Sequence, residues 1–223
     1  MNPMYIDTEK EITSFPYTLR KNTMNDMLIR AVDIIAALFA LLISSPVMIV
    51  VAILIKLEDG AGPIIFKQTR VGHGGKLFDM YKFRSMYTDA EMRLDELMAQ
   101  NEVEGNMFKM KNDPRITKVG KIIRKLSLDE FPQFINVLKG DMSMVGPRPP
   151  LEREYENYSD RDKKRLLVKP GCTGLWQVSG RNELSFDQMI NLDLEYIEKR
   201  NIFFNLKIML LTFKEITVFG KGM

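Results

Sequence analysis

The feature that most constrains this chain is a run of 22 residues without a charge, from Ile34 to Ile55. As a single helix the run would be about 33 Å long, which is enough to cross the hydrocarbon core of a bilayer. It is too long and too internal for a secretory signal peptide, and no small-residue cleavage site follows it. A buried core helix is the alternative, but such helices are seldom this long and apolar. The sequence therefore predicts a helix in contact with a membrane.

Ser45 and Pro46 lie at the centre of this run. Proline removes a backbone donor and clashes with the carbonyl four residues earlier, so the helix should bend there. Serine hydroxyls can bond carbonyls that such a break strands in hydrocarbon. Three basic residues lie near each end of the run, so the positive-inside rule favours neither orientation. Two interpretations stay open: a kinked spanning helix, and a helix-break-helix that enters and leaves the same leaflet.

Composition excludes several kinds of site. The chain has one cysteine and one histidine, so neither an intramolecular disulfide nor a multi-histidine zinc site can form. Acid–base chemistry must rest mainly on carboxylates, lysine or tyrosine. The formal net charge of +3 is ordinary, and we expect no nucleic-acid partner. Local basic groups can still bind anionic lipid or a phosphorylated substrate.

The rest of the chain predicts a mostly helical domain with a small β component, an α+β fold. Two short strands, 64–68 and 77–83, should form a hairpin. Helices are expected at about 88–101, 132–139, 151–167 and 187–199. Segment 116–125 carries apolar residues amid a cluster of basic ones, which is typical of a solvated face. The first 25 residues should be loosely ordered.

A second apolar segment, 201–219, lies near the end of the sequence. Lys207 and Lys214 are seven residues apart, so they share one helical face, as an interfacial membrane helix requires. A helix packed into the core of the domain is the alternative.

The motif with the clearest chemistry is the adjacent carboxylates Asp129 and Glu130, just before a helix start. Arg124 and the helix dipole would keep an aspartate ionised, as a nucleophile or a Mg²⁺ ligand must be. The neighbouring carboxylate could act as a base. The structural alternative is a capping box, in which Ser127 and Glu130 cap the helix.

Basic residues in three other segments suit phosphate binding. Prolines on both sides of Arg148 restrict the backbone, which presents the guanidinium with little entropy left to lose. Strand alternation places Lys82 and Arg84 on one face. Arg181 follows a glycine-rich stretch that could contact a nucleotide or sugar. A structural ion pair, a solvated strand face and simple turn glycines are the respective alternatives.

These motifs occur together in one known family. The matching segments are the Ser45-Pro46 break, FKQTRVG (66–72), YKFRSM (81–86), 113–150, 169–182 and 192–200. In this order they cover the chain from about Met24 to its end, and the central stretch is long and specific. The sequence resembles the monotopic bacterial phosphoglycosyl transferases, the bacterial sugar transferases that start capsule, exopolysaccharide and other glycan assembly.

The resemblance implies an architecture of three parts: a flexible segment 1–25, a re-entrant membrane helix 26–58 that breaks at Ser45-Pro46, and a catalytic domain 59–223 that ends in an interfacial helix. It implies location at the bacterial inner membrane, with the catalytic domain on the cytoplasmic face. Larger relatives carry further N-terminal membrane helices and a soluble domain that this sequence lacks, so we expect a minimal catalytic unit.

The resemblance also implies a two-step reaction from a UDP-sugar to a polyprenyl phosphate such as undecaprenyl phosphate. Asp129 would attack the sugar-bearing phosphate and expel UMP, and Glu130 would act as base towards the lipid phosphate. Mg²⁺ is the expected cofactor, touching Asp129. The expected substrate-binding residues are Lys82, Arg84, Arg124, Arg148 and Arg181.

Several points stay open from the sequence. Segment 87–112 matches no motif of the family, and neither the sugar nor the pathway is readable. Homo-oligomerisation and polysaccharide assembly proteins stay open as partners. Two rival functions remain: a non-enzymatic membrane adaptor that binds polyprenyl phosphate, and a phosphohydrolase that transfers to water.

Overall fold

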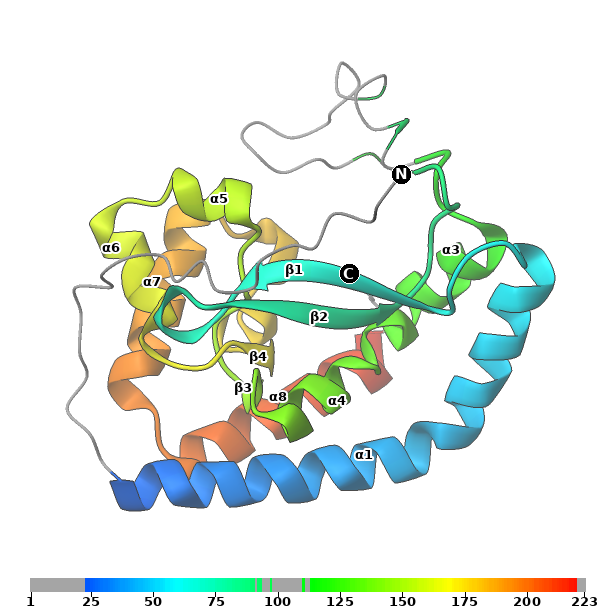
Figure 1. The fold of residues 1–223 in the computed structure, drawn as a ribbon. Helices are drawn as coiled ribbons and strands as arrows, with labels where there is room; N and C mark the ends of the chain where they lie inside the picture. Colours follow the sequence, from blue (N-terminus) through cyan, green and yellow to red (C-terminus); the bar gives the residue numbers. More distant parts are fainter. Residues whose placement is uncertain (1–22, 91, 94–96, 98–109, 111–112, 220–223) are drawn as a thin grey trace.

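The computed structural model describes residues 23–219, apart from 91, 94–96, 98–109 and 111–112. In this part of the chain the fold is mostly helical, with two small sheets of two strands each (Figure 1). The expected α+β class is therefore confirmed. Most of the helix expected at 88–101, and nearly all of the segment 1–25 expected to be flexible, lie outside the described residues; residues 88–90 and 92–93 form turns, where the helix was expected to begin.

The charge-free run lies within α1, a helix of 36 residues from Thr23 to Glu58. The helix is bent (Figure 1), as the proline predicted, and it continues as one helix through Ser45 and Pro46, where the family resemblance implied a break. The Ser45 hydroxyl donates to the Leu42 carbonyl at 2.8 Å, a bond close to the turn that proline weakens. Among the described residues, α1 is the one helix long and apolar enough to cross a membrane.

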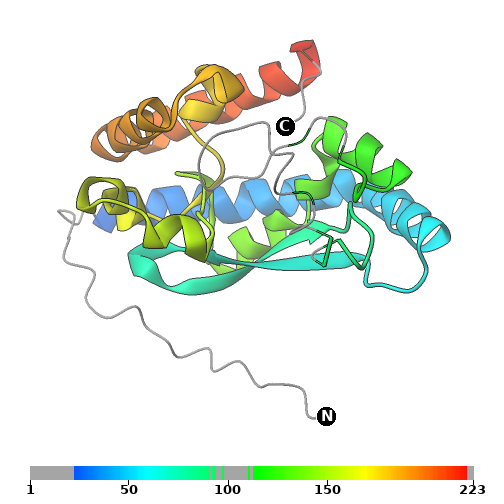
Figure 2. The same ribbon diagram turned by 90° about the horizontal axis from the view of Figure 1, so that it is seen from above.

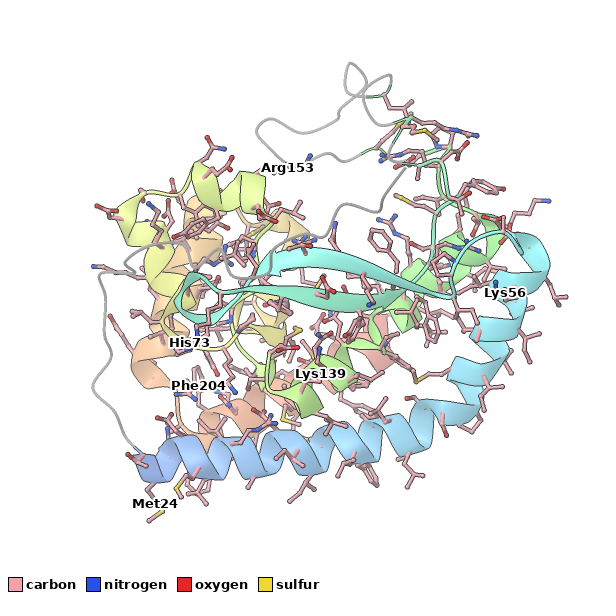
Figure 3. All side chains as sticks on the ribbon, in the orientation of Figure 1. Met24, Lys56, His73, Lys139, Arg153 and Phe204 are labelled. Atoms are coloured by element: carbon pink, nitrogen blue, oxygen red, sulfur yellow. The ribbon has the colours of Figure 1, made fainter. Side chains whose placement is uncertain are left out.

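One face of α1 packs against the domain, and the opposite face leaves large apolar side chains exposed. Ile29, Ala37, Val51 and Ile55 are buried on the packed face. Side chains along the outer side of α1 point away from the domain (Figure 3). The exposed apolar residues of this helix include Ile35, Leu38, Phe39, Leu42, Ile43, Ile49, Val50 and Ile53. An exposed apolar surface of this size is typical of proteins that contact membranes or partners.

Strands β1 (Ile65–Val71) and β2 (Leu77–Phe83) form the expected antiparallel hairpin. The register places Ile65 opposite Phe83 and Val71 opposite Leu77. The turn between the strands uses Gly74 with a φ of 66°, a conformation that favours glycine. The hairpin extends across the domain and brings the end of β2 towards the second half of α1 (Figure 1).

Helices α3 (Lys118–Lys125) and α4 (Gln133–Lys139) follow the hairpin; α4 matches the sequence prediction, whereas α3 was not predicted as a helix. Both halves of α1 pack against this part of the domain. Ala37, in the first half, lies in an apolar cluster with α4, and Ile55, in the second half, lies in a cluster with Ile123 of α3. The two halves of α1 are therefore attached to neighbouring parts of one domain.

The second sheet was not predicted from the sequence. Strands β3 (Ser143–Val145) and β4 (Gly171–Thr173) pair in parallel, Ser143 with Gly171 and Val145 with Thr173. Each strand has only three residues, which is too short for an alternating pattern to be recognised. Their pairing holds the proline-rich loop after β3 against the glycine-rich stretch after β4.

The single helix expected at 151–167 is wrong. The segment divides into α5 (Glu152–Glu156), α6 (Asp160–Lys163) and a 3-10 turn, Lys164–Leu167. The break has a local cause, because Ser159 and Asp162 form a capping box at the start of α6. The Ser159 hydroxyl accepts from the Asp162 amide, and the Asp162 carboxylate accepts from the Ser159 amide.

Helices α7 (Phe186–Lys199) and α8 (Ile202–Phe219) complete the described chain and match the prediction. Seen from above, they flank one side of α1 and the hairpin flanks the other (Figure 2). Arg165 and Asp193 form a buried ion pair that joins α7 to the segment after α6. On α8, Phe203, Leu210 and Phe213 are exposed, as are the two lysines expected at a membrane surface.

Candidate active site

Asp129 and Glu130, called the carboxylate pair below, lie in a tight turn between α3 and α4. After α3 ends, Ser127 adopts a left-handed backbone conformation with φ 54° and ψ 21°, and a 3-10 helix, Leu128–Glu130, follows. The Ser127 side chain makes no capping hydrogen bond. The capping box, which was the structural alternative for this motif, is therefore wrong, and both carboxylates have another environment.

Glu130 forms an ion pair with Lys82 at the end of β2, with 2.7 Å between Nζ and Oε1. Burial alone would raise the pKa of Glu130. The charge and hydrogen bond of Lys82, supported by the charge of Arg148, outweigh burial and hold the pKa below its usual value. Glu130 is therefore ionised near neutral pH.

The neighbouring carboxylate has the opposite shift. Asp129 is 9% exposed, and burial raises its pKa to about 6, with a further rise from the charge of Glu130. The charges of Lys82 and Arg124 oppose this rise. A carboxylate that is poorly solvated and titrates near neutrality is a stronger nucleophile than one held by several hydrogen bonds.

Asn136 positions α4 so that Lys82 reaches Glu130. Its side chain is fully buried, its Oδ1 accepts from the Tyr81 amide at 2.9 Å, and its Nδ2 donates to the Asp79 carbonyl at 2.7 Å. These bonds fix the register between α4 and β2. The sequence analysis missed Asn136; the available signal was a polar residue on the apolar face of a short helix.

Two of the expected phosphate-binding arginines lie near the carboxylate pair. The charge of Arg124 acts on Asp129, and that of Arg148 acts on Glu130. Within the described residues, neither guanidinium group has a hydrogen-bond or ion-pair partner. Their donors are therefore available to an anionic ligand that can accept two bonds from each.

Arg70 of β1 extends this basic group. Its side chain is buried and donates to Gln68 Oε1 at 2.7 Å and to the Pro149 carbonyl at 3.0 Å. Burial, followed by the charge of Arg148, lowers the pKa of Arg70 to about 10. Two neighbouring guanidinium groups repel each other, so an anion placed beside them would be strongly stabilised.

The other two expected binding residues are placed differently. Arg84 is buried and bonded to the backbone of Asp59, and its Nη1 lies 3.6 Å from the Asp59 carboxylate. It therefore serves to attach the end of β2 to the loop after α1. Arg181 lies in the turn after Gly180, and its Nε donates to the Gln177 carbonyl at 2.8 Å.

The fit of a metal ion depends on the carboxylate pair. Among the described residues, no group of three or more His, Cys, Asp and Glu side chains is placed to hold an ion. Mg²⁺ commonly takes one or two protein carboxylates and completes its coordination with water and substrate phosphates. Asp129 fits this role better than Glu130, which is already paired with Lys82.

This arrangement suits attack on a phosphorus atom. A buried carboxylate can act as the nucleophile, and the surrounding cations can stabilise the charge of a phosphorylated substrate. The site stands next to α1, because Lys82 precedes Phe83, which packs against the second half of that helix. A substrate with a lipid part could therefore reach the carboxylate pair from a membrane surface.

Comparison with known proteins points to the same chemistry. The family model described as "Bacterial sugar transferase" matches residues 24–219. The chain is 52% identical over 194 residues to "Galactosyl transferase CpsE" of Streptococcus agalactiae, a match that covers 86% of this chain and 42% of that protein. It is 46% identical over 191 residues to "Undecaprenyl-phosphate galactose phosphotransferase" of Salmonella typhimurium, with 84% and 40% covered.

A third relative is closer in length. "Exopolysaccharide production protein ExoY" of Rhizobium meliloti is 41% identical over 187 residues, and the match covers 82% of each chain. This chain thus spans about two fifths of the first two relatives and most of the third.

Proposed function

Since the chain belongs to the bacterial sugar transferase family, we propose that it transfers a sugar-1-phosphate from a UDP-sugar to undecaprenyl phosphate and releases UMP, as the first step of capsule or exopolysaccharide synthesis. One observation carries this proposal: a buried aspartate with a pKa of about 6 adjoins an ion-paired glutamate and two arginines that lack partners among the described residues. The name of the Salmonella relative gives the same lipid acceptor.

In the first step, a carboxylate oxygen of Asp129 attacks the sugar-bearing β-phosphorus of the donor. The bond between this phosphorus and the bridging oxygen breaks, and UMP leaves with the bridging oxygen. The product is an acyl phosphate between Asp129 and the sugar phosphate. Arg124 and Arg148 neutralise the phosphate oxygens as charge moves to the leaving group.

In the second step, an oxygen of the lipid phosphate attacks the same phosphorus, and the bond to Asp129 breaks. The product is a lipid diphosphate sugar, and the aspartate is regenerated. Glu130 accepts the proton of the lipid phosphate. Its ion pair with Lys82 makes it a weak base, so Lys82 must first move its hydrogen bond to the incoming phosphate.

Mg²⁺ is the expected cofactor, and it would neutralise diphosphate charge and polarise the bond that breaks. Asp129 is the residue that would hold it, together with oxygens of the substrate. Lys82, Arg124 and Arg148 orient the phosphates around this position, and Arg181 belongs to the loop proposed for the nucleotide or sugar.

The topology that goes with this function is re-entrant. Segment 26–58 enters and leaves one leaflet with its bend at Ser45-Pro46, and the catalytic domain, 59–223, stays on the cytoplasmic face of the inner membrane. The support is that α1 is bonded to the same domain near both ends, through Arg30 to α4 and through Glu58 to α3. A helix crossing the bilayer would place these two contacts on opposite sides.

Substitution of each carboxylate tests the reaction. Asp129→Asn should reduce UMP release by about 10³-fold or more, because an amide is a poor nucleophile. Glu130→Gln should slow transfer to lipid more than it slows formation of the covalent adduct. The measurement is UMP release in nanodiscs with Mg²⁺ and a panel of UDP-sugars, with and without undecaprenyl phosphate, and adduct detection by intact mass spectrometry.

Glu152→Gln, at an exposed carboxylate of α5, is the matched control and should retain the wild-type rate. Wild-type activity in Asp129→Asn would contradict the assigned nucleophile. Absence of release with every donor, from folded protein, would favour the adaptor function. Release of free sugar phosphate without the lipid would favour a hydrolase.

A further inference from the structure

We propose that α1 positions the carboxylate pair by holding the far ends of the two helices that flank it, with Glu58 on α3 and Arg30 on α4. This inference rests on the proposed function. It assigns to the membrane helix a part in catalysis that is separate from attachment to the bilayer, and it makes Arg30 and Glu58 positioning residues.

Glu58, in the last turn of α1, caps the start of α3. Its Oε1 accepts from the Lys118 amide at 2.7 Å and its Oε2 accepts from the Val119 amide at 2.8 Å. The Thr117 hydroxyl accepts from the next amide, that of Gly120, at 2.8 Å. Three amides at the N-terminus of α3 are thereby satisfied, and a negative charge lies at the positive end of the helix dipole.

Arg30, in the first part of α1, makes the complementary contact at the end of α4. Its Nη1 donates to the Val137 carbonyl at 2.6 Å and its Nη2 donates to the Leu138 carbonyl at 2.9 Å. A positive charge therefore lies at the negative end of the α4 dipole and binds two carbonyls of its last turn, of which that of Val137 also accepts from the Gly140 amide at 3.1 Å. The negative Glu58 thus lies at the N-terminus of α3 and the positive Arg30 at the C-terminus of α4, and each charge is the one that the helix dipole stabilises at that end.

The carboxylate pair lies between these two anchored helices. α3 ends at Lys125, α4 begins at Gln133, and the segment between them contains Asp129 and Glu130. Figure 1 shows α3 beside the C-terminal end of α1 and α4 above its first half, so the segment bridges the bend of α1. Figure 3 labels Met24 and Lys56 near the two ends of this helix.

A change in the bend of α1 alters the separation between Arg30 and Glu58. Because each residue is bonded to a flanking helix, α3 then shifts relative to α4, and the turn that connects them must adjust. Thr117 also donates its amide to the Ser85 carbonyl at 3.1 Å, three residues after Lys82, so the shift reaches the partner of Glu130 as well. Displacement of a catalytic group by about 1 Å can cost about 10²-fold in rate.

The simpler alternative is that these contacts are two unrelated helix caps. The two residues are 28 positions apart on one helix, which corresponds to about 40 Å if it were straight, and effects of such distant substitutions normally add. If α1 holds both helices as a unit, release of either end removes the restraint, and release of the second end has little further effect. Additivity therefore separates the two explanations.

The experiment is a double-mutant cycle of Glu58→Gln and Arg30→Gln, read as the single-turnover rate of UMP release in nanodiscs. We expect each substitution to slow release about tenfold, with the affinity for the UDP-sugar within about twofold of wild type. The double variant should be no more than about twofold slower than the slower single variant, whereas independent caps predict a loss of about 100-fold.

Controls lie at the same ends of α1. Lys56→Gln removes a side chain that bonds Gly60 and Gly62, and Asp26→Asn removes the ion pair with Arg200; neither contact involves α3 or α4. Both controls should release UMP within about twofold of wild type, since lost surface pairs cost little. If a Gln variant fails to fold, Glu58→Asp and Arg30→Lys complete the same cycle.

Additive effects, or equal losses in the controls, would overturn the proposal. So would a rise in KM for the UDP-sugar with an unchanged maximal rate, since that would indicate altered binding rather than altered positioning. None of these results would affect the proposed function, which instead fails if Asp129→Asn releases UMP normally.

Discussion

Asp129 and Glu130 are neighbours in sequence, yet their carboxyl groups have opposite pKa shifts. The difference lies in their partners: Lys82 is bonded to Glu130, whereas Asp129 is buried and feels the charge of Lys82 only from a distance. The same charge therefore keeps Glu130 ionised and leaves Asp129 near its titration point. Because their pKa values differ, two carboxyl groups of the same chemical type can take different roles in one reaction.

The pH dependence of adduct formation should report the state of Asp129. Only the ionised carboxylate attacks phosphorus, so the single-turnover rate should rise about tenfold per pH unit below a pKa of about 6 and level off above it. Lys82→Met should move the rising limb to higher pH, because it removes the largest influence that lowers this pKa. Glu130→Gln should move it to lower pH, because it removes a negative charge.

Rates measured between pH 5 and pH 8 are enough to locate the rising limb, and the exposed Lys76→Met serves as a control that should not move it. If the rate rises over the same pH range in the wild type, Lys82→Met and Glu130→Gln, a group other than Asp129 controls the rate.

Ser127 determines how the chain passes from α3 to the carboxylate pair. Its φ of 54° places a non-glycine residue in the left-handed region, which costs about 1–2 kcal/mol, and its hydroxyl makes no capping bond. The chain needs this conformation because α3 must end before the 3-10 turn that contains the pair. The strain is located at the residue next to the site.

Substitution of Ser127 tests this interpretation against a capping role. Ser127→Gly should raise the free energy of unfolding by up to about 1 kcal/mol, because glycine adopts positive φ without a steric cost. Ser127→Ala should be nearly neutral. A capping serine would behave differently: Ala would cost about 1 kcal/mol and Gly would give no gain. Thermal unfolding of the detergent-solubilised protein measures the stability of both variants. If Ser127→Ala is less stable than Ser127→Gly, and Ser127→Gly is no more stable than the wild type, the capping role is correct.

At the scale of the molecule, local patterns predicted the hairpin, α4, α7 and α8, because each has a pattern of its own, whereas the basic residues of α3 masked its helical character. They did not predict the pairing of β3 with β4, since two strands of three residues acquire their partners only after the intervening segment folds. The division of 151–167 was detectable, because Ser159 and Asp162 form a capping box within it.

The candidate site shows the same limit. The sequence identified the carboxylate pair and the basic residues around it, but it could not assign partners. Strand alternation placed Lys82 and Arg84 together, yet one bonds Glu130 and the other bonds Asp59, because Arg84 follows the end of β2 and turns towards α1. Partners of this kind depend on distances between elements, which no local pattern contains.

The attachment of α1 at both ends leads to a prediction about the whole molecule. A straight helix of 36 residues would be about 54 Å long, well beyond the hydrocarbon core of about 30 Å. The bent helix exposes its apolar side chains along its length, while Arg30 and Glu58 remain bonded to one polar domain. Transfer of either end across the bilayer would break these charged contacts or carry the domain through hydrocarbon, and both cost far more than a bend.

Both flanks of α1 should therefore face the same side of the membrane. In a Cys172→Ala background, single cysteines at the exposed positions Thr23 and Ala61 should both react with a membrane-impermeant maleimide in inverted inner-membrane vesicles, and neither should react in intact spheroplasts. Leu42→Cys, in the middle of the exposed apolar face, should stay unreactive in both until detergent is added. Reaction of Thr23→Cys from one side and Ala61→Cys from the other would establish a spanning helix. In that case Arg30 and Glu58 could not both keep their bonds to α4 and α3, so one labelling pattern tests the topology and the contacts that predict it.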